Sequence, residues 1–338
     1  MKKKTVLLLL QYVIFFGLGF TLIYMQYRGL TPQNMAELKE ALVQFRERYW
    51  ILIPVTVIGF FSHLIRGLRW RLMLEPLHMK PTVVNITGAV LIGYLTNLLI
   101  PRMGEVAKCT VLARYEKEPA DKVIGTIVAE RAFDLICLML ICVIAFFAQA
   151  QVIGSYLSHI GTEYASKQNV PLKITLLVLG LAAFILLLRW IYKRNKSNKI
   201  GKFIAGMGDG LRSIMQMRQR LRFIIYTILL WGSYLSLIYI GFWSLPATEG
   251  LGIGPALMVL IVGSLGMIVT PGGIGAYPPA VQLALATFYG IKSSYGLAFG
   301  WISWLAQTLI VIIFGLLALF ILPLYNRNRD GQAAVDQQ

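Results

Sequence analysis

Acidic residues are scarce in this chain. Only 15 of its 338 residues are Asp or Glu, against 32 Lys and Arg, so the formal net charge is +17. Such an excess can indicate a nucleic-acid-binding protein, but basic cytoplasmic loops produce the same excess in a membrane protein. The apolar content of 57% and the mean hydropathy of +0.68 favour the membrane explanation. We therefore expect no nucleic-acid partner.

Catalytic and metal-binding signatures are also lacking. The three cysteines form no CxxC pair, so nothing indicates a disulfide or a metal site. The sequence contains no HExxH, DxD, GxSxG or P-loop motif. Of the fifteen carboxylates, only Glu105, Glu130 and Asp134 lie in or beside predicted intramembrane segments. We expect no catalytic residue, metal or cofactor, and we do not expect an enzyme.

What the chain has instead is long apolar runs. A helix needs about 20 mostly apolar residues to cross a hydrocarbon core of about 30 Å. The first run follows Lys2–Lys4 as in a signal peptide, but no small-residue cleavage site follows it, so we expect a retained span. The predicted spans are 5–25, 50–66, 123–148, 171–190, 221–243 and 296–322.

The segment between the first two spans is more polar. From Pro32 to Tyr49, Leu38, Leu42 and Phe45 recur at helical spacing among charged residues. This pattern predicts an amphipathic helix that lies on the membrane surface.

Two further apolar segments are interrupted by proline and glycine. Residues 83–100 and 255–269 each end in a break, and weaker helices resume at 106–115 and 279–289. The breaks are Pro101-Arg102-Met103-Gly104-Glu105 and Thr270-Pro271-Gly272-Gly273-Ile274-Gly275. Proline removes a helical N–H donor and glycine lets the chain turn. Each segment is therefore either two spans or one re-entrant hairpin.

The distribution of lysine and arginine favours the hairpins. With two re-entrant hairpins and a cytoplasmic N-terminus, cytoplasmic segments hold 24 basic residues and outer segments hold 7. If 83–101 crossed fully and 106–115 did not, the ten basic residues of 189–222 would face outside, which the positive-inside rule opposes. We therefore predict an all-α polytopic protein of the inner (plasma) membrane, with about six spans, two re-entrant hairpins and both termini in the cytoplasm.

The two halves of the chain share one organisation. Pro101 and Pro271 lie 170 residues apart, and so do Gly93 and Gly263. Each half contains a span, a broken hairpin and a span, and the extra span between the halves inverts the second one. Inverted halves with paired broken helices are typical of transporters, and their breaks point at the substrate site. The predicted organisation is one domain over 1–325 (half one about 50–148, linker span 171–190, half two about 221–322) and a short polar cytoplasmic tail at 326–338.

The breaks supply the first candidate substrate contacts. Because backbone at membrane depth must find partners or line water, two breaks imply a polar cavity. Helices that begin after Gly104 and Gly275 would present N–H groups and positive dipole ends, which bind phosphate or carboxylate. Arg102 either clamps a phosphate or contacts lipid headgroups, and Glu105 and Lys108 can share a helix face. The opposing gate would be formed by Pro271, Gly272, Gly273 and Gly275, unless this stretch is a simple loop.

Ionisable residues also lie inside a predicted span. Glu130, Arg131 and Asp134 fall within five residues of each other. An ionisable residue near a span's centre costs about 2.5–3.5 kcal/mol on insertion scales. The three residues either pin this helix to the hairpin as a buried ion cluster or form a coupling or headgroup-contact site, and the two roles are compatible.

A basic cluster lies at the end of the second span. It consists of Arg66, Arg69, Trp70 and Arg71. Basic residues with tryptophan at this place are typical of an interfacial anchor to anionic headgroups. The alternative is a role in guiding an anionic lipid towards the first hairpin.

Four motifs resemble the flippase-like family, also called the lysylphosphatidylglycerol synthase transmembrane region. They are Arg69-Trp70-Arg71, Asn97-Leu-Leu-Ile-Pro101-Arg102-Met-Gly104-Glu105, Gly125-Thr126-Ile-Val-Ala-Glu130-Arg131-Ala-Phe-Asp134 and Pro271-Gly-Gly-Ile-Gly275-Ala276. The resemblance extends over about 10–325.

The resemblance implies a membrane domain that flips aminoacylated phosphatidylglycerol to the outer leaflet, fused in the best-known members to a cytoplasmic aminoacyl-transferase domain. We expect a stand-alone member without that domain. One departure is Tyr277-Pro278-Pro279, where relatives often have an acidic residue.

The expected function is translocation of an anionic phospholipid or of a lipid-linked (polyprenyl) phosphate between the leaflets. Two alternatives remain at this point. One is a coupled transporter of a small soluble anion, and the other is a non-catalytic membrane subunit of a lipid- or glycan-modifying synthase. The partners that we expect are membrane lipids and an aminoacyl- or glycosyltransferase.

Overall fold

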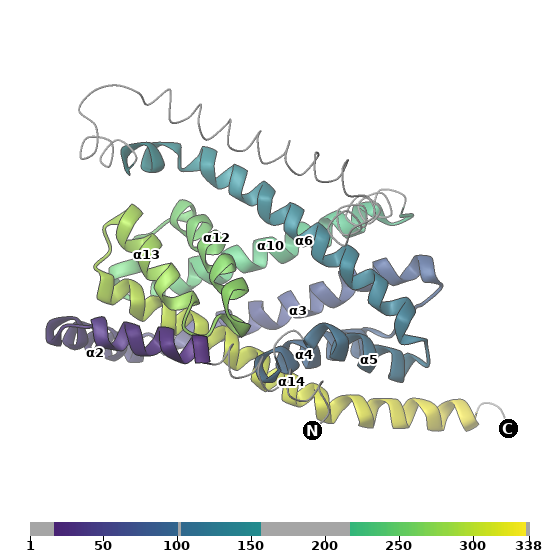
Figure 1. The fold of residues 1–338 in the computed structure, drawn as a ribbon. Helices are drawn as coiled ribbons and strands as arrows, with labels where there is room; N and C mark the ends of the chain where they lie inside the picture. Colours follow the sequence, from purple (N-terminus) through teal and green to yellow (C-terminus); the bar gives the residue numbers. More distant parts are fainter. Residues whose placement is uncertain (1–16, 101–102, 157–216, 336–338) are drawn as a thin grey trace. The chain divides into compact units, whose positions relative to one another are not determined.

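The computed structural model describes residues 17–100, 103–156 and 217–335, which are helical apart from short connections (Figure 1). No strand occurs among these residues, which confirms the all-α prediction. The chain divides into two compact units. The larger unit joins residues 1–126 and 221–338, and the smaller unit comprises residues 127–220.

Four helical stretches within the described ranges are long and apolar enough to cross a membrane. They are Tyr49–Leu77, Val123–Ala148, Arg220–Ser244 and Ser293–Arg329. These stretches correspond to the second, third, fifth and sixth predicted spans. Of the first predicted span, the described part is helical from 17 to 29. The fourth, 171–190, lies outside the described residues.

Threonine side chains begin two helices in the first half of the chain. The hydroxyls of Thr31 and Thr82 accept hydrogen bonds, both of 3.2 Å, from the N–H groups of Asn34 and Asn85. This is the N-cap role that threonine performs at a helix start. The elements here are α2 (Pro32–Glu47), η1 (Tyr49–Ile51), α3 (Leu52–Leu74), η2 (Glu75–Leu77), α4 (Val83–Leu99), α5 (Gly104–Glu116) and α6 (Ala120–Ala148).

The second half repeats this succession of helices. Its elements are α10 (Arg220–Gly241), η3 (Phe242–Ser244), α11 (Pro246–Glu249), α12 (Ile253–Val269), η4 (Pro271–Gly273), α13 (Tyr277–Tyr289) and α14 (Ser293–Val335). Shifted by 170 residues, α4 coincides with α12. The part of the chain expected as a polar tail begins as the last turns of α14, which stays helical to Val335.

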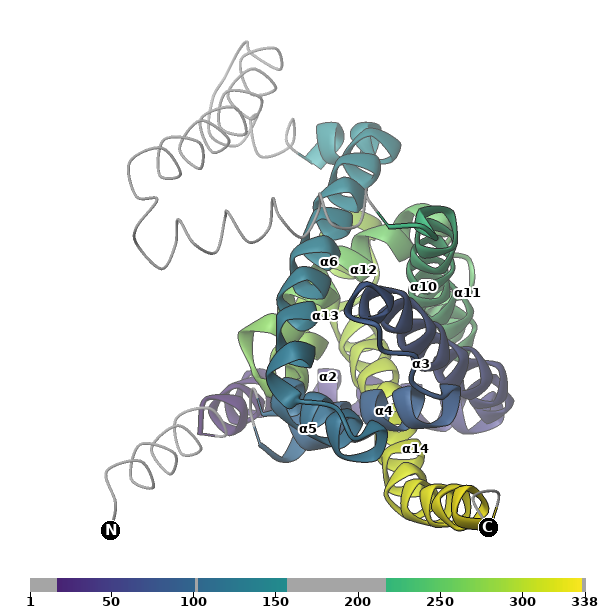
Figure 2. The same ribbon diagram turned by 90° about the vertical axis from the view of Figure 1, so that its right-hand side faces the viewer.

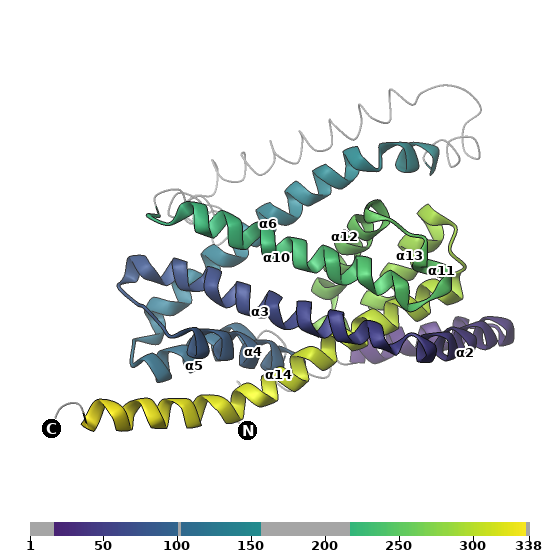
Figure 3. The ribbon, with the colours of Figure 1, turned by 180° about the vertical axis from the view of Figure 1, so that it is seen from behind.

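Helices α3 and α10, which the 170-residue offset relates, run in opposite directions. Near the middle of α3, Arg66 contacts Tyr234 of α10, whereas Arg69, further along α3, contacts Phe223 near the start of α10. Figure 3 shows α3 and α10 side by side. This antiparallel arrangement is what an inverted repeat requires.

The last helix, α14, is the central helix of the larger unit. It packs against α2, α3, α4 and α13 (Figures 1 and 2). Where it crosses α4, Gly88 faces Leu322 and Gly315 faces Leu95. Small residues let helix backbones approach closely, so both crossing points depend on glycine.

The helix predicted on the membrane surface, α2, packs against α14. Ala41 is buried, whereas Leu42, expected among the apolar-face residues, is half exposed. Glu37 accepts hydrogen bonds from Ser294 and from Lys292, whose Nζ lies 3.0 Å away. These bonds hold the pKa of the Glu37 carboxyl below its ordinary value, and they raise the pKa of Lys292.

Candidate functional site

The helices on either side of each predicted break form a packed pair, α4 with α5 and α12 with α13 (Figure 1). In the first pair, a Cβ on Gly104 would lie only 2.2 Å from the carbonyl oxygen of Gly93, so the two helices meet backbone to backbone. Asn97 Oδ1 accepts a 2.8 Å hydrogen bond from the N–H of Gly104. One N–H that we expected to face a phosphate therefore has an internal partner. Pro101 and Arg102 lie outside the described residues.

Lys108 lies one turn into α5 and is only 4% exposed. Its Nζ lies 4.0 Å from the centre of the Trp70 ring, a cation–π contact worth about 2 kcal/mol when desolvated. Trp70 Nε1 donates a 2.9 Å hydrogen bond to the hydroxyl of Thr126, which fixes the orientation of the ring. Glu105, which we expected to share a face with Lys108, is half-buried.

Two more cations are buried along α3. The guanidinium of Arg66 donates hydrogen bonds of 2.8 and 3.3 Å to the hydroxyl of Tyr234 and lies 5.8 Å from the centre of the Tyr94 ring. Arg69, which is fully buried, lies 5.7 Å from the centre of the Phe223 ring. Aromatic faces thus surround positive charge in the interior of the larger unit.

This burial changes our interpretation of the basic cluster. An interfacial anchor has to reach the headgroups, but Arg66, Arg69 and Trp70 face the interior, and only Arg71 is partly exposed. The reason is that α3 does not end at residue 66. It continues to Leu74, and the i, i+3 and i+4 spacing keeps the three side chains on its inner face.

The smaller unit contains the predicted ion cluster on α6. Arg131 lies 3.2 Å from a carboxylate oxygen of Glu130 and 3.8 Å from one of Asp134. The Glu130 side chain is fully buried, whereas Arg131 keeps 42% of its side chain exposed. The structure therefore brings these three residues together as an ion cluster along one helix.

The second break is a glycine loop with an unusual backbone. Gly272, Gly273 and Gly275 have φ of 61°, 74° and 73°, in the left-handed region that favours glycine. Two side chains from other helices hold the loop by its carbonyls. Trp304 Nε1 donates to Gly272 at 2.6 Å, and Gln26 Nε2 donates to Gly275 at 2.8 Å.

The two breaks lie against each other. A Cβ on Gly272 would lie 2.9 Å from Cδ2 of Leu98, in the last turn of α4, and α4 contacts η4. The tips of both hairpins thus meet, although they come from opposite halves of the chain. The polar cavity that the sequence predicted between the breaks stays a prediction.

Sequence reasoning did not single out several residues of this region. Tyr94 and Tyr234 carry hydroxyl groups within apolar helices, and Gln26 carries an amide close to another apolar helix. A polar group in such a place is a signal of a functional or structural contact in a membrane protein. Trp304 gave no such signal because its partner is a backbone carbonyl.

The comparisons with known proteins agree with this architecture. The family model described as the lysylphosphatidylglycerol synthase TM region matches residues 8–328, which include both hairpins and all four candidate spans. No curated protein and no solved structure matches the chain. The match covers nearly the whole chain, and the protein is therefore a membrane protein that belongs to the lysylphosphatidylglycerol synthase TM region family.

Proposed function

We propose that the protein moves an anionic lipid headgroup, on a phospholipid or a lipid-linked phosphate, between the leaflets of the inner membrane. In this proposal both hairpins are re-entrant, both termini are cytoplasmic, and the acyl chains stay in the surrounding lipid. The observation that carries the proposal is the burial of Arg66, Arg69 and Lys108 in the larger unit, on α3 and on the first hairpin. The family's relation to lipid modification supports a lipid substrate.

Buried cations give the path its preference for anions. Ionisable residues inside a membrane are costly and mark substrate pathways. Lysine binds phosphate as a point charge, and arginine binds it with a planar fork of donors. In this scheme Lys108 and Arg102 contact the headgroup at the first hairpin, and Glu130, Arg131 and Asp134 brace α6.

The glycine loop supplies the proposed gate. Three of the five residues from Pro271 to Gly275 are glycines, and Gly272 touches Leu98 of the first hairpin. Separation of these two residues would open a path between the hairpins, and their contact would close it. Glycines at φ values that other residues avoid give this loop conformations that a helix lacks.

Lipid exchange in proteoliposomes tests the proposal. Labelled phosphatidylglycerol, its lysyl form and a polyprenyl phosphate are offered to the wild type, to Lys108→Gln and to Arg114→Gln, a control at an exposed position of the same helix. We expect faster exchange of at least one lipid, a loss of about tenfold in Lys108→Gln, as for about 1.4 kcal/mol of lost interaction, and no loss in the control. No exchange of any lipid by folded wild type would reject the proposal, and uptake of labelled phosphate would then test a soluble-anion transporter.

A further inference from the structure

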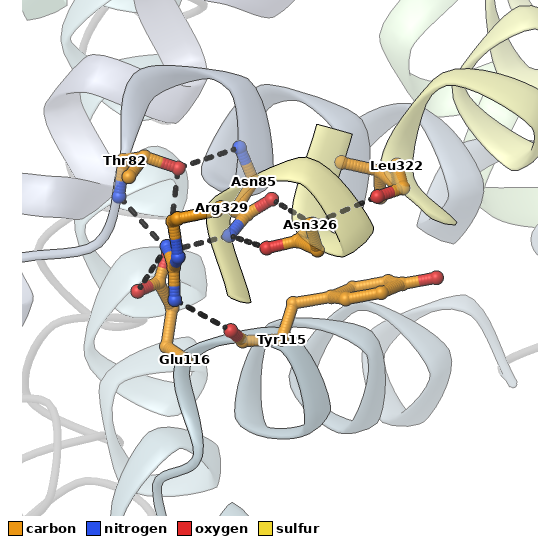
Figure 4. A network of polar contacts seen from close by, with 7 residues as sticks. All are labelled: Thr82, Asn85, Tyr115, Glu116, Leu322, Asn326 and Arg329. Carbon is orange, nitrogen blue, oxygen red and sulfur yellow. Dashed lines mark hydrogen bonds and ion pairs between the residues drawn. The ribbon is translucent and has the colours of Figure 1, made fainter. Parts of the chain in front are cut away.

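A network of polar side chains lies at the base of the first hairpin, the end away from its break (Figure 4). Asn85 is fully buried and Asn326 is 6% exposed. The network joins three helices: Thr82 and Asn85 at the start of α4, Tyr115 and Glu116 at the end of α5, and Asn326 and Arg329 in the last turns of α14.

The two asparagines form a reciprocal pair. Asn85 Nδ2 donates to Asn326 Oδ1 at 2.9 Å, and Asn326 Nδ2 donates to Asn85 Oδ1 at 2.7 Å. Asn326 Nδ2 also donates to the carbonyl of Leu322 at 2.8 Å. Each amide thus uses both its donor and its acceptor side, which fixes the relative position of α4 and α14 at this point.

The carboxylate of Glu116 connects the pair to the other helices. It accepts hydrogen bonds from Asn85 Nδ2 at 2.7 Å and from the N–H of Thr82 at 2.9 Å. Arg329 lies 3.3 Å from its second oxygen and donates to the carbonyl of Tyr115 at 3.0 Å. The start of α4 and the end of α5 are therefore joined to one another and to α14.

Apolar contacts alone would hold the hairpin less specifically. Along the rest of their interface, α4 and α14 meet through Leu91, Ile92, Ala318 and Leu322. Such contacts are not directional, whereas hydrogen bonds between helices in a membrane fix register. The network lies at one end of a 17-residue helix, about 25 Å from the other end at about 1.5 Å per residue. A small rotation at the base therefore moves the tip by a larger distance.

We propose that Asn85, Glu116, Asn326 and Arg329, the base clasp, are positioning residues that keep the tip of the first hairpin against the glycine loop. The close packing of Gly93 on Gly104 lets α4 and α5 move as one body, so the clasp acts on Leu98 at the far end. The functional meaning of this role rests on the proposed function, in which the contact between the breaks closes the path. Weakening of the clasp shifts the hairpin towards the open arrangement.

Cysteine labelling reports the position of the tip without measuring transport. The native Cys109, Cys137 and Cys142 are replaced by alanine, and either Leu98→Cys or Leu99→Cys is introduced. Residue 98 is partly covered, whereas Leu99 is 64% exposed and serves as the reference. The rate of reaction with N-ethylmaleimide is measured in detergent, at a temperature where circular dichroism shows native helix content.

The clasp variant is Asn326→Leu, and its matched control is Asn328→Leu at an exposed position of the same helix. We expect Asn326→Leu to raise the labelling of Leu98→Cys roughly fivefold or more, the population change expected for the loss of such a hydrogen bond, with Leu99→Cys unchanged. The control should change neither rate. If Asn326→Leu does not fold, Arg329→Ala replaces it as the clasp variant, with the exposed Arg327→Ala as its control. The same two labelling rates are then compared.

An unchanged labelling rate of Leu98→Cys in a folded clasp variant would overturn the proposal. An equal rise at both reporters would also overturn it, because that result indicates general loosening of the fold. Labelling is independent of any lipid, so the clasp can fail this test while the transport proposal stands. Conversely, absence of lipid exchange would leave the labelling result intact.

Discussion

The two hairpins share a plan but differ in chemistry. Each has a first helix of 17 residues and a second helix of 13 residues. Residues 83–116 of the first hairpin include five charged side chains, whereas residues 251–291 of the second include none. The same arrangement of two helices thus carries charged side chains in the first half of the protein and an uncharged, glycine-rich loop in the second.

The hairpins are also held at different places. The first is joined to α14 at its base by the clasp, with the buried Asn85 and Asn326 at its centre. The second is held at its tip, where Trp304 and Gln26 donate to loop carbonyls. An element fixed at its base can present a charge at a constant place, and a loop that two side-chain hydrogen bonds tie to other helices can be released. The first hairpin is therefore the better candidate for headgroup binding and the second for gating.

The largest expected effect comes from the backbone contact within the first hairpin. In Gly104→Ala the new methyl group would meet the Gly93 carbonyl at 2.2 Å and Asn97 at 2.4 Å, so the hairpin cannot keep its packing. We expect about 3 kcal/mol of destabilisation, the upper part of the range for overpacked sites. The melting temperature of purified protein in detergent measures it. Gly125→Ala, where nothing lies within 4 Å, is the control, and an equal effect in both would contradict the predicted close contact.

A smaller effect is expected at the second break. Gly272 has φ of 61°, where an alanine costs about 1–2 kcal/mol. The nearest atom to its new methyl group would be the end of the Leu98 side chain, which can move. Gly272→Ala should therefore lower the unfolding free energy by less than Gly104→Ala does. Gly250→Ala, at a φ of −78° and with nothing nearby, serves as the reference. If both second-half variants have wild-type stability, the loop is not held in this conformation.

Removal of one loop hydrogen bond should have a still smaller effect. Trp304→Phe keeps an aromatic ring but loses the donor to the Gly272 carbonyl, and a hydrogen bond contributes about 1 kcal/mol net. Trp301→Phe, one turn earlier on α14, shows how much the ring change alone costs. Thermal unfolding monitored by tryptophan fluorescence measures both variants. An equal loss in the two would mean that the indole N–H does not hold the loop.

The smallest effect concerns α2, outside both hairpins. Hydrogen bonds from Ser294 and Lys292 lower the pKa of Glu37 below 4.5, so their contribution is present above that pH and is lost as pH falls through the lowered pKa. The raised pKa of Lys292 keeps the pair charged on the alkaline side up to at least pH 10.5. Glu37→Gln should be less stable than wild type at neutral pH, and this difference in unfolding free energy should shrink below pH 4.5. The exposed Glu47→Gln should have the stability of wild type at every pH. A constant difference from pH 7 to pH 3 would contradict this assignment.

Local patterns in the sequence located the helices of both hairpins well. Proline and glycine clustered at the end of an apolar run favour a helix end, and α4 does end at Leu99 and α12 at Val269, next to the two predicted breaks. The predicted helices 83–100 and 255–269 differ from α4 and α12 by no more than two residues at either end. The 170-residue offset also related α4 to α12 correctly, because it depends on element lengths and not on side-chain identity.

Contacts between distant elements could not be predicted in the same way. Periodicity assigns a residue to a helix face but does not say which helix covers that face. The sequence therefore predicted Arg66 and Arg69 as interfacial anchors to headgroups, whereas in the structure both contact aromatic residues of α10. Asn326 was expected in a polar tail, and its burial depends on Asn85, which lies 241 residues away.

The central claim is that the first hairpin binds the headgroup and the second hairpin gates its passage. The most direct test measures the initial rate of lipid exchange against the mole fraction of labelled lipid, in wild type, Lys108→Gln and Trp304→Phe. We predict that Lys108→Gln raises the mole fraction needed for half-maximal exchange, and that Trp304→Phe changes the maximal rate alone. Equal changes of half-saturation in both variants, or a change of maximal rate alone in Lys108→Gln, would contradict this division of roles.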